Sequence, residues 1–471
     1  MRLREVAVTM AATLLSFGSA LCLKHVVGLT SGSVLLAVVL AMSIGQQQAR
    51  GDARHRQTLF PGALLLPLLA VMAGEISKRM YTHPNVGDAL FVVGMSGAIW
   101  LRRFGGIGRR AGTLLTTALT ATLIAPGPVV PLGPHAPTRW WGAVVAVIAL
   151  AWVRIARSVA EGTGILPARP VVGERPVPQR ASGRLPASTK MALQMAAALA
   201  GAFAAGRAQF GMHWTWTVLT AFIVGSGNRG RGDVTQKAAL RVAGATGGTL
   251  IATLLANAFP AGDDWSVVTI FVVLAIALWL RPLSYAFWAA GMTAALALLY
   301  GFYGEQGAHL LIDRLEGILI GAAIGVAAAW LVFPIRNVDV IRRHLAIALG
   351  EIAIRLAGDE THPTFPADSV IVIHESTTAA ELAAGSVRWL RVLPSWWHTA
   401  LAYADASGEL AVGAANVAAL PGQRLELSAE ARSSLTGDVT AARRALASDA
   451  PHQRVADLPV LARRIAAALR R

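Results

Sequence analysis

The chain has 471 residues, of which 55% are hydrophobic and 14% are charged. Soluble proteins average roughly 25% charged residues, so this composition excludes an ordinary soluble domain. Apolar runs along two thirds of the length instead indicate a polytopic helical membrane protein. The formal net charge of +16 divides into a basic surplus of 15 in residues 1–334 and of 1 in residues 335–471, which excludes a basic tail for nucleic acid.

Residues 1–154 contain six apolar segments that we expect to form a first set of membrane spans. They lie near residues 6–23, 26–44, 59–74, 87–101, 111–125 and 140–153. Arg2 and Arg4 precede the first segment, as in a signal peptide, but no small-residue cleavage pattern follows before Val26, so we expect a retained helix. Residues 155–190, rich in Pro and Arg, are expected to form an extended cytoplasmic linker.

Residues 191–334 contain a second set of six segments, and the chain ends with a different kind of sequence. The segments lie near 191–208, 214–225, 239–259, 265–280, 284–300 and 315–333. Several fall short of the ~20 residues of a full crossing, so twelve spans is the preferred number and ten is an alternative. Residues 335–471 have balanced charge and amphipathic spacing, which predicts a cytoplasmic helical domain of four or five helices.

Three short motifs of the first half return in the second half at nearly constant distance. The offsets are 179, 181 and 178 residues, and the pairs are Trp100-Leu101-Arg102-x8-Ala111-Gly112 with Trp279-Leu280-Arg281-x8-Ala290-Gly291, Arg50-Gly51-Asp52 with Arg231-Gly232-Asp233, and Ala151-Trp152 with Ala329-Trp330. Agreement of the three offsets indicates a duplicated unit, and transporters are commonly built in this way. We therefore expect an all-α fold of two parallel six-helix repeats followed by the cytoplasmic helical domain.

The distribution of basic residues predicts the orientation in the membrane. With the amino terminus inside, 21 of the 27 basic residues of 1–334 fall on the cytoplasmic side, leaving Lys24, Lys78, Arg79, Arg139, Arg207 and Arg314 outside. This is the positive-inside pattern, so both termini are expected in the cytoplasm. Arg outnumbers Lys 38 to 4, which suggests a high-GC bacterial genome and hence a bacterial inner membrane.

One spacing of arginine and glycine occurs twice in the second half. Arg241 precedes Gly244 and Gly248 at the expected cytoplasmic mouth of the ninth span, and Arg314 precedes Gly317 and Gly321 at the start of the twelfth. Glycines four residues apart share one helix face and permit close helix packing. The simpler interpretation is packing, with the arginines reaching the headgroups; the functional interpretation is that the arginines face an anionic substrate.

The motifs of residues 213–248 resemble the fusaric acid resistance family. They are His213-Trp214-x-Trp216-Thr217-Val218-Leu219-Thr220, then Asn228-Arg229-Gly230-Arg231-Gly232-Asp233, then the segment from Arg241 to Gly248, and a last span from Leu315 to Pro334. This family contains aromatic acid exporters and is distantly related to plant malate-permeable anion channels, so the resemblance implies a plasma-membrane transporter of organic anions with cytoplasmic helices. The third span of the first half has Arg56 and Gly62 instead of the Arg-x-x-Gly spacing, which leaves open whether both halves contribute to a site.

The sequence predicts an exporter of small organic anions, perhaps aromatic carboxylates in chemical class, with arginine providing the positive charge. Arg102 and Arg281 are the first candidates for the substrate path, followed by Arg241 and Arg314, and Trp214 or Trp216 could line a path for an aromatic ligand or belong to an interfacial belt. The alternatives are an anion channel, favoured by the lack of Asp or Glu in mid-span, and a membrane scaffold without transport. Homo-oligomerisation and an adaptor protein stay open.

No cofactor, metal or catalytic site is expected. Gly225-x-Gly227-x-x-Gly230 has the spelling of a dinucleotide motif but follows an apolar helix, not a strand, and no Gly-Lys dipeptide of a Walker A loop occurs. The eleven histidines show no metal-ligand spacing, and no nucleophile–base arrangement supports an enzyme. The expected partners are the lipid bilayer and a small organic anion, without nucleic acid.

Overall fold

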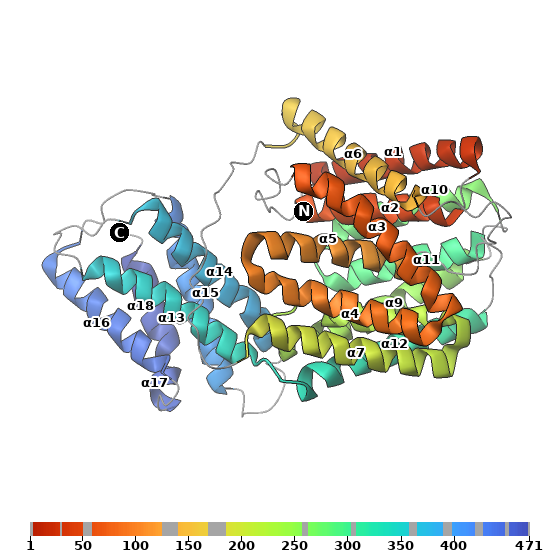
Figure 1. The fold of residues 1–471 in the computed structure, drawn as a ribbon. Helices are drawn as coiled ribbons and strands as arrows, with labels where there is room; N and C mark the ends of the chain where they lie inside the picture. The colour runs from red at the N-terminus through yellow and green to blue at the C-terminus, as the bar shows by residue number, and fades with distance from the viewer. Residues whose placement is uncertain are drawn as a thin grey trace. The chain divides into compact units, whose positions relative to one another are not determined.

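A computed structural model describes residues 3–28, 31–49, 59–124, 140–167, 185–256, 262–302, 308–357, 365–389, 398–419, 427–447 and 452–469. Every regular element in these ranges is a helix, which confirms the predicted all-α class (Figure 1). The chain divides into two compact units: residues 1–226 with 237–333, and residues 227–236 with 334–471. We call them the membrane unit and the carboxyl-terminal unit.

The membrane unit is built from twelve α-helices, and each coincides with one of the expected spans. They are α1 (Leu3–Val27), α2 (Ser31–Ala49), α3 (Leu59–Thr82), α4 (Pro84–Trp100), α5 (Gly105–Ile124), α6 (Trp141–Gly162), α7 (Ala187–Phe210), α8 (Thr215–Gly225), α9 (Arg231–Ala256), α10 (Asp264–Leu280), α11 (Tyr285–Phe302) and α12 (Ala308–Leu331). Two short 3₁₀ helices, η2 (Leu101–Phe104) and η3 (Gly211–His213), join α4 to α5 and α7 to α8. The arginine and aspartate at 50–52, and residues 168–184 of the linker, lie outside the described residues.

Five stretches of the described chain are long and apolar enough to cross a membrane. They are Leu3–Val27, Pro84–Ile124, Trp141–Gly162, Ala187–His213 and Tyr285–Phe302, the second of which contains both α4 and α5. Three further apolar helices are shorter: Gly32–Gln48, Thr215–Gly225 and Asp264–Leu280. These helices agree with a multi-pass membrane protein, whereas the number of crossings stays a prediction.

The two halves of the membrane unit contact one another through corresponding helices. The fourth helix of the first half, α4, packs on the first helix of the second, α7, and the fourth helix of the second, α10, packs on the first helix of the first, α1. Each contact has an apolar core: Phe91 and Phe203 meet in one, and Met10 and Leu278 belong to the other. Reciprocal packing of this kind is what two repeats related by a two-fold axis produce.

A matching close approach occurs within the repeated helix pairs. A Cβ on Gly112 of α5 would collide with Ala98 of α4, and a Cβ on Gly291 of α11 would collide with Ala277 of α10. Both members of the second pair lie 179 residues beyond those of the first, which is the offset of the Trp-Leu-Arg motif. Only glycine permits these two helix pairs to approach so closely.

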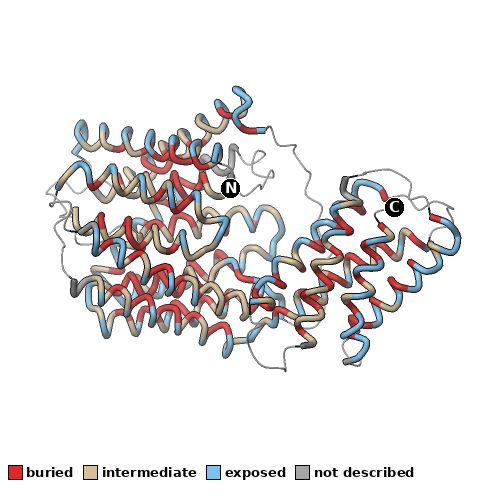
Figure 2. The backbone as a smooth tube through the Cα atoms, turned by 180° about the vertical axis from the view of Figure 1, so that it is seen from behind, coloured by how far each residue is buried: buried red, intermediate tan, exposed pale blue. Residues whose placement is uncertain are grey.

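The carboxyl-terminal unit contains α13 (Asn337–Leu356), α14 (Ala367–Trp389), α15 (His398–Ala419), α16 (Ala429–Ala445), α17 (His452–Ala456) and α18 (Leu458–Ala468). Their apolar faces enclose one core, to which Leu345, Ile373, Leu410 and Ile465 contribute (Figure 2). Polar residues cover the outer faces, as amphipathic helices of a bundle require.

Residues 227–236 belong to the carboxyl-terminal unit although they precede it by a hundred residues in the chain. Asn337 holds them: its Oδ1 accepts the Gly232 N–H at 2.8 Å, and its Nδ2 donates to Asp233 Oδ1 at 3.0 Å and to Ser386 Oγ at 2.8 Å. The Arg231 N–H also donates to the Ile335 carbonyl at 2.9 Å. The expected boundary at residue 334 therefore omitted a separate segment of this unit.

Candidate functional site

The glycine face of α12 packs directly on α8. A Cβ on Gly321 would collide with the Thr217 carbonyl, and one on Gly317 would lie 3.2 Å from the Thr217 hydroxyl oxygen. Arg314, Gly317 and Gly321 follow the three- and seven-residue spacing of a single helix face. Arg314 therefore begins the face of α12 that is turned toward α8, inside the protein.

The glycine face of α9 packs on α11 in the same manner. A Cβ on Gly244 would collide with the Ala286 carbonyl, and one on Gly248 with Ala290. Helix α9 begins at Arg231, eight residues before the span expected at 239–259, so Arg241 lies almost three turns inside the helix. Its expected position at a cytoplasmic mouth is therefore wrong, because the helix continues through polar residues that hydropathy excluded.

Arg241 and Arg314 are both buried, each with 3% of its surface exposed. The Arg241 Nε and one Arg314 Nη have no hydrogen-bond partner, and within the described residues no carboxylate lies in ion-pair distance of either guanidinium. Leaving one charge of a buried pair without its partner typically costs about 3–5 kcal/mol. Two buried cations in this state form a site that favours an anion.

Helix α11 supplies the polar neighbours of these arginines. Tyr285 interacts with Arg241, and Arg314 lies within electrostatic range of both Tyr300 and Arg241. Thr293, fully buried with its hydroxyl unpaired, lies between the two tyrosines in sequence. Residues 285, 293 and 300 are eight and fifteen apart, close to two and four turns, so their hydroxyls follow one helix face over about 22 Å.

Helix α8 forms another wall of this polar region. It has 11 residues, nine of which are buried, and the hydroxyls of its fully buried Thr217 and Thr220 have no partner. Trp216 stacks on His213 with ring centroids 4.6 Å apart and meets Tyr300 edge-on at 6.0 Å. An aromatic surface therefore borders Tyr300, which itself neighbours Arg314.

Trp214 has a different environment from Trp216. It is 1% exposed, and its ring lies 4.6 Å from the Arg207 guanidinium and 5.2 Å from the Phe203 ring. Arg207 of α7 in turn forms a two-point ion pair with Asp88 of α4, through Nε at 2.5 Å and Nη2 at 2.6 Å. These contacts fasten the two halves together and place Trp214 in their shared core.

Arg102 and Arg281 have unlike neighbours despite their matching motif. Arg102 lies in η2, half-buried, with its Nε unpaired and Arg109 as a charged neighbour. Arg281 follows α10, donates to Gln46 of α2, and lies 5.3 Å from the Trp288 ring centroid. That these two arginines face each other across a two-fold axis stays a prediction.

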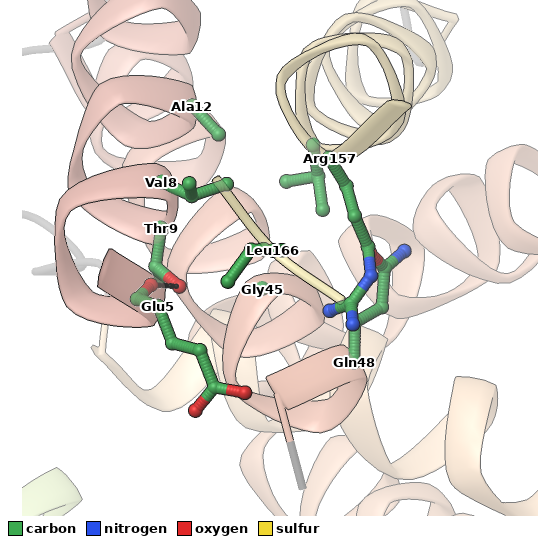
Figure 3. A pocket seen from close by; sticks show the side chains of 9 residues that line it. Glu5, Val8, Thr9, Ala12, Gly45, Gln48, Arg157 and Leu166 are labelled. Carbon is green, nitrogen blue, oxygen red and sulfur yellow. Dashed lines mark hydrogen bonds between the residues drawn. The ribbon is translucent and has the colours of Figure 1, made fainter. Parts of the chain in front are cut away.

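The first half does not repeat the polar residues of the second. At the offset of 179 residues Tyr300 corresponds to Ala121, and at 181 Trp216 corresponds to Leu35. A separate pocket of about 270 Å³ lies in the first half, between α1, α2 and α6, with Glu5 and Arg157 at its rim (Figure 3). Arg157 is paired there with Glu161 at 3.1 Å, so this pocket lacks the unpaired cations of the second half.

Sequence reasoning missed the hydroxyl row of Tyr285, Thr293 and Tyr300. Its signal was the same-face spacing of polar residues in an otherwise apolar segment, which marks the inward face of a span. In the parts of the chain that the structure describes, no group of His, Cys, Asp or Glu could hold a metal ion.

The comparisons with known proteins agree with the part of the chain in which this region lies. Neither a curated protein nor a solved structure matches the chain. One family model matches residues 195–328, which contain α8, α9, α11 and almost all of α12. The resemblance seen in the motifs is thereby confirmed: residues 195–328 are a domain of the fusaric acid resistance protein-like family.

Proposed function

We propose that the protein exports small organic anions across the bacterial inner membrane, and that the anion passes the region of α8, α9, α11 and α12. The carrying observation is the pair of buried guanidiniums, Arg241 and Arg314, which have N–H groups without partners. A carboxylate entering an apolar interior requires positive charge, and arginine keeps its charge there. The membership of this region in a family of membrane transporters supports the proposal.

Aromatic carboxylates are the proposed substrate class. The stacked His213 and Trp216 rings, with Tyr300 edge-on to Trp216, offer apolar faces beside the buried Arg314. A planar ring with a carboxylate could place its ring against the aromatic side chains and its charge on the guanidinium. The fused or single-ring identity of the acid is a matter for a substrate panel.

The first prediction concerns anion flux in proteoliposomes. Arg241→Gln and Arg314→Gln should each reduce uptake of a radiolabelled benzoate-type acid at least tenfold, because each removes about 1.5–3 kcal/mol of charge-assisted hydrogen bonding. The Lys variants should retain part of the flux, since they keep the charge but not the planar donor geometry. The Arg79→Gln variant, which removes an exposed cation, is the matched control and should transport normally.

The same assay separates the two arginine pairs. Full flux in the Arg241→Gln, Arg314→Gln double variant at normal abundance, together with loss in Arg102→Gln and Arg281→Gln, would relocate the path to the Trp-Leu-Arg positions. Absence of flux for every acid in a correctly folded protein would favour the scaffold alternative.

An anion channel is the second candidate function. Expected spans carry no acidic residue near their middle, so an obvious proton-coupling group is missing from the sequence. Planar-bilayer recording decides between them: stepwise currents at micromolar to millimolar acid indicate a channel, whereas saturable flux without unitary currents indicates a carrier.

A further inference from the structure

We propose that the turn between α4 and α5, residues 100–110, binds the headgroup of an anionic phospholipid. This turn is distinct from the proposed anion path and does not depend on it. It contains Arg102, Arg103, Arg109 and Arg110, four arginines within nine residues.

The charge of this turn has no counterpart in the surrounding sequence. No Asp or Glu occurs between Asp88 and Glu161, a stretch that contains α4, α5 and most of α6. Arg102 itself has Arg109, a like charge, as its charged neighbour, and its Nε is buried without a hydrogen-bond acceptor. An anionic group would relieve this repulsion and supply the missing acceptor.

The aromatic side chains of the turn organise one of the arginines. The Arg103 guanidinium lies 5.0 Å from the Trp100 ring centroid and 5.2 Å from that of Phe104, while the two rings meet edge-on at 5.0 Å. Stacking on aromatic faces orients a guanidinium and leaves its edge available for a phosphate. Arg103 is exposed, so its edge is accessible.

Apolar groups beside these charges indicate that the ligand is a lipid and not a soluble anion. Phe104 is 55% exposed and Ile107 is 82% exposed. Large apolar side chains next to arginines at a span end are typical of the membrane interface, where rings lie at the level of the headgroups and the charges meet phosphate. A free phosphate would leave these apolar groups uncovered.

The turn has a fixed backbone, which makes it a formed site and not a loose run of charges. Gly105 has φ of 73°, a left-handed value that reverses the chain without strain only for glycine. Gly108 lies so close to the Leu101 carbonyl that a Cβ would collide with it. The corresponding turn of the second half carries a single arginine, Arg281, whose guanidinium is engaged by Gln46.

The test is lipid retention by the purified full-length protein, measured by native mass spectrometry after detergent exchange with added phosphatidylglycerol or phosphatidylcholine. The wild type should retain phosphatidylglycerol in preference to phosphatidylcholine. Arg103→Gln with Arg110→Gln should weaken that retention on the order of tenfold, since each basic residue at an anionic surface contributes several-fold. Lys78→Gln with Arg79→Gln removes the same charge from exposed positions on α3 and should retain the lipid.

Two further measurements keep the outcomes distinct. Arg103→Lys keeps the charge but loses the planar stacking group, so it should show intermediate retention if the aromatic pair orients the ligand. Equal retention of both lipids by the wild type, or equal loss in the two double variants, would overturn the proposal. Displacement of phosphatidylglycerol by millimolar inorganic phosphate would also overturn it and make the site one for soluble anions.

Discussion

Gly247 and Gly248 are adjacent in α9 but have opposite surroundings. A Cβ on Gly248 would collide with Ala290 of α11, whereas a Cβ on Gly247 would meet nothing within 4 Å. Burial of the two positions thus differs by a single step around the helix, and the pair provides a matched comparison of packing and helix propensity.

We predict that Gly248→Ala lowers the apparent melting temperature of the detergent-solubilised protein, because forcing a methyl group into a full helix contact costs typically about 1–3 kcal/mol. Gly247→Ala should leave it unchanged or raise it, since alanine is favoured over glycine in a helix by roughly 0.5–1 kcal/mol. The measurement is the loss of the monodisperse chromatographic peak on heating. Equal melting temperatures for the two variants would show that α9 and α11 can separate without cost.

The Arg-x-x-Gly spacing allowed the inward faces of α9 and α12 to be predicted, because residues three and seven apart share a face in any helix. The same reasoning did not find Tyr285 and Tyr300, which lie on a third helix and meet the arginines only through tertiary packing. The neighbours of Arg281 were also inaccessible, because its acceptor Gln46 is 235 residues away in the chain.

At the scale of the elements, the helices of the membrane unit could be predicted because each is apolar along most of its length. The beginning of α9 could not, since residues 231–238 are polar and their helical state depends on contacts of the carboxyl-terminal unit's own segment, 227–236. Asn337 makes those contacts and lies beyond residue 328, where the family match ends.

We predict that Asn337→Ala exposes this segment to protease. The variant loses the acceptor of the Gly232 N–H and the donor to Asp233, and leaving such buried groups unpaired costs about 1–3 kcal/mol each. Trypsin should then cleave after Arg229 or Arg231 several-fold faster than in the wild type, as followed by intact-mass analysis of the fragments.

Asn416→Ala is the control for that experiment. It removes the same side chain from α15 of the same unit, where the amide nitrogen has no hydrogen-bond partner in the described structure. Its cleavage at Arg229 and Arg231 should match the wild type. Identical rates in the Asn337 and Asn416 variants would mean that the segment is held by its backbone contacts alone.

At the scale of the whole molecule, the contacts within the membrane unit agree with the alternation of twelve crossings. Arg281 with Gln46 and Arg4 with Ile165 join residues predicted to be cytoplasmic. Arg207 with Asp88 joins residues predicted to be periplasmic, and the Gly262 N–H donates to the Phe302 carbonyl at 3.0 Å on that same predicted side.

We predict that reporter fusions after Gly211 and Gly262 report a periplasmic location and that fusions after Leu166 and Leu283 report a cytoplasmic one. The expectation follows from the excess of basic residues on one side of the membrane. Alkaline phosphatase and green fluorescent protein fusions measure the two outcomes independently. A periplasmic signal after Leu166 would make the repeats inverted and remove the parallel arrangement.

The division of the carboxyl-terminal unit into two chain segments has a consequence for biosynthesis. Gly232 leaves the ribosome 105 residues before Asn337, so at about 5–20 residues per second its partner is absent for roughly 5–20 s. During that interval α9 to α12 must insert while the Arg231–Asp233 loop waits without its acceptor and donor. Completion of the loop therefore reports that translation has passed the last membrane helix, which makes its protection in nascent chains a natural marker of a finished membrane unit.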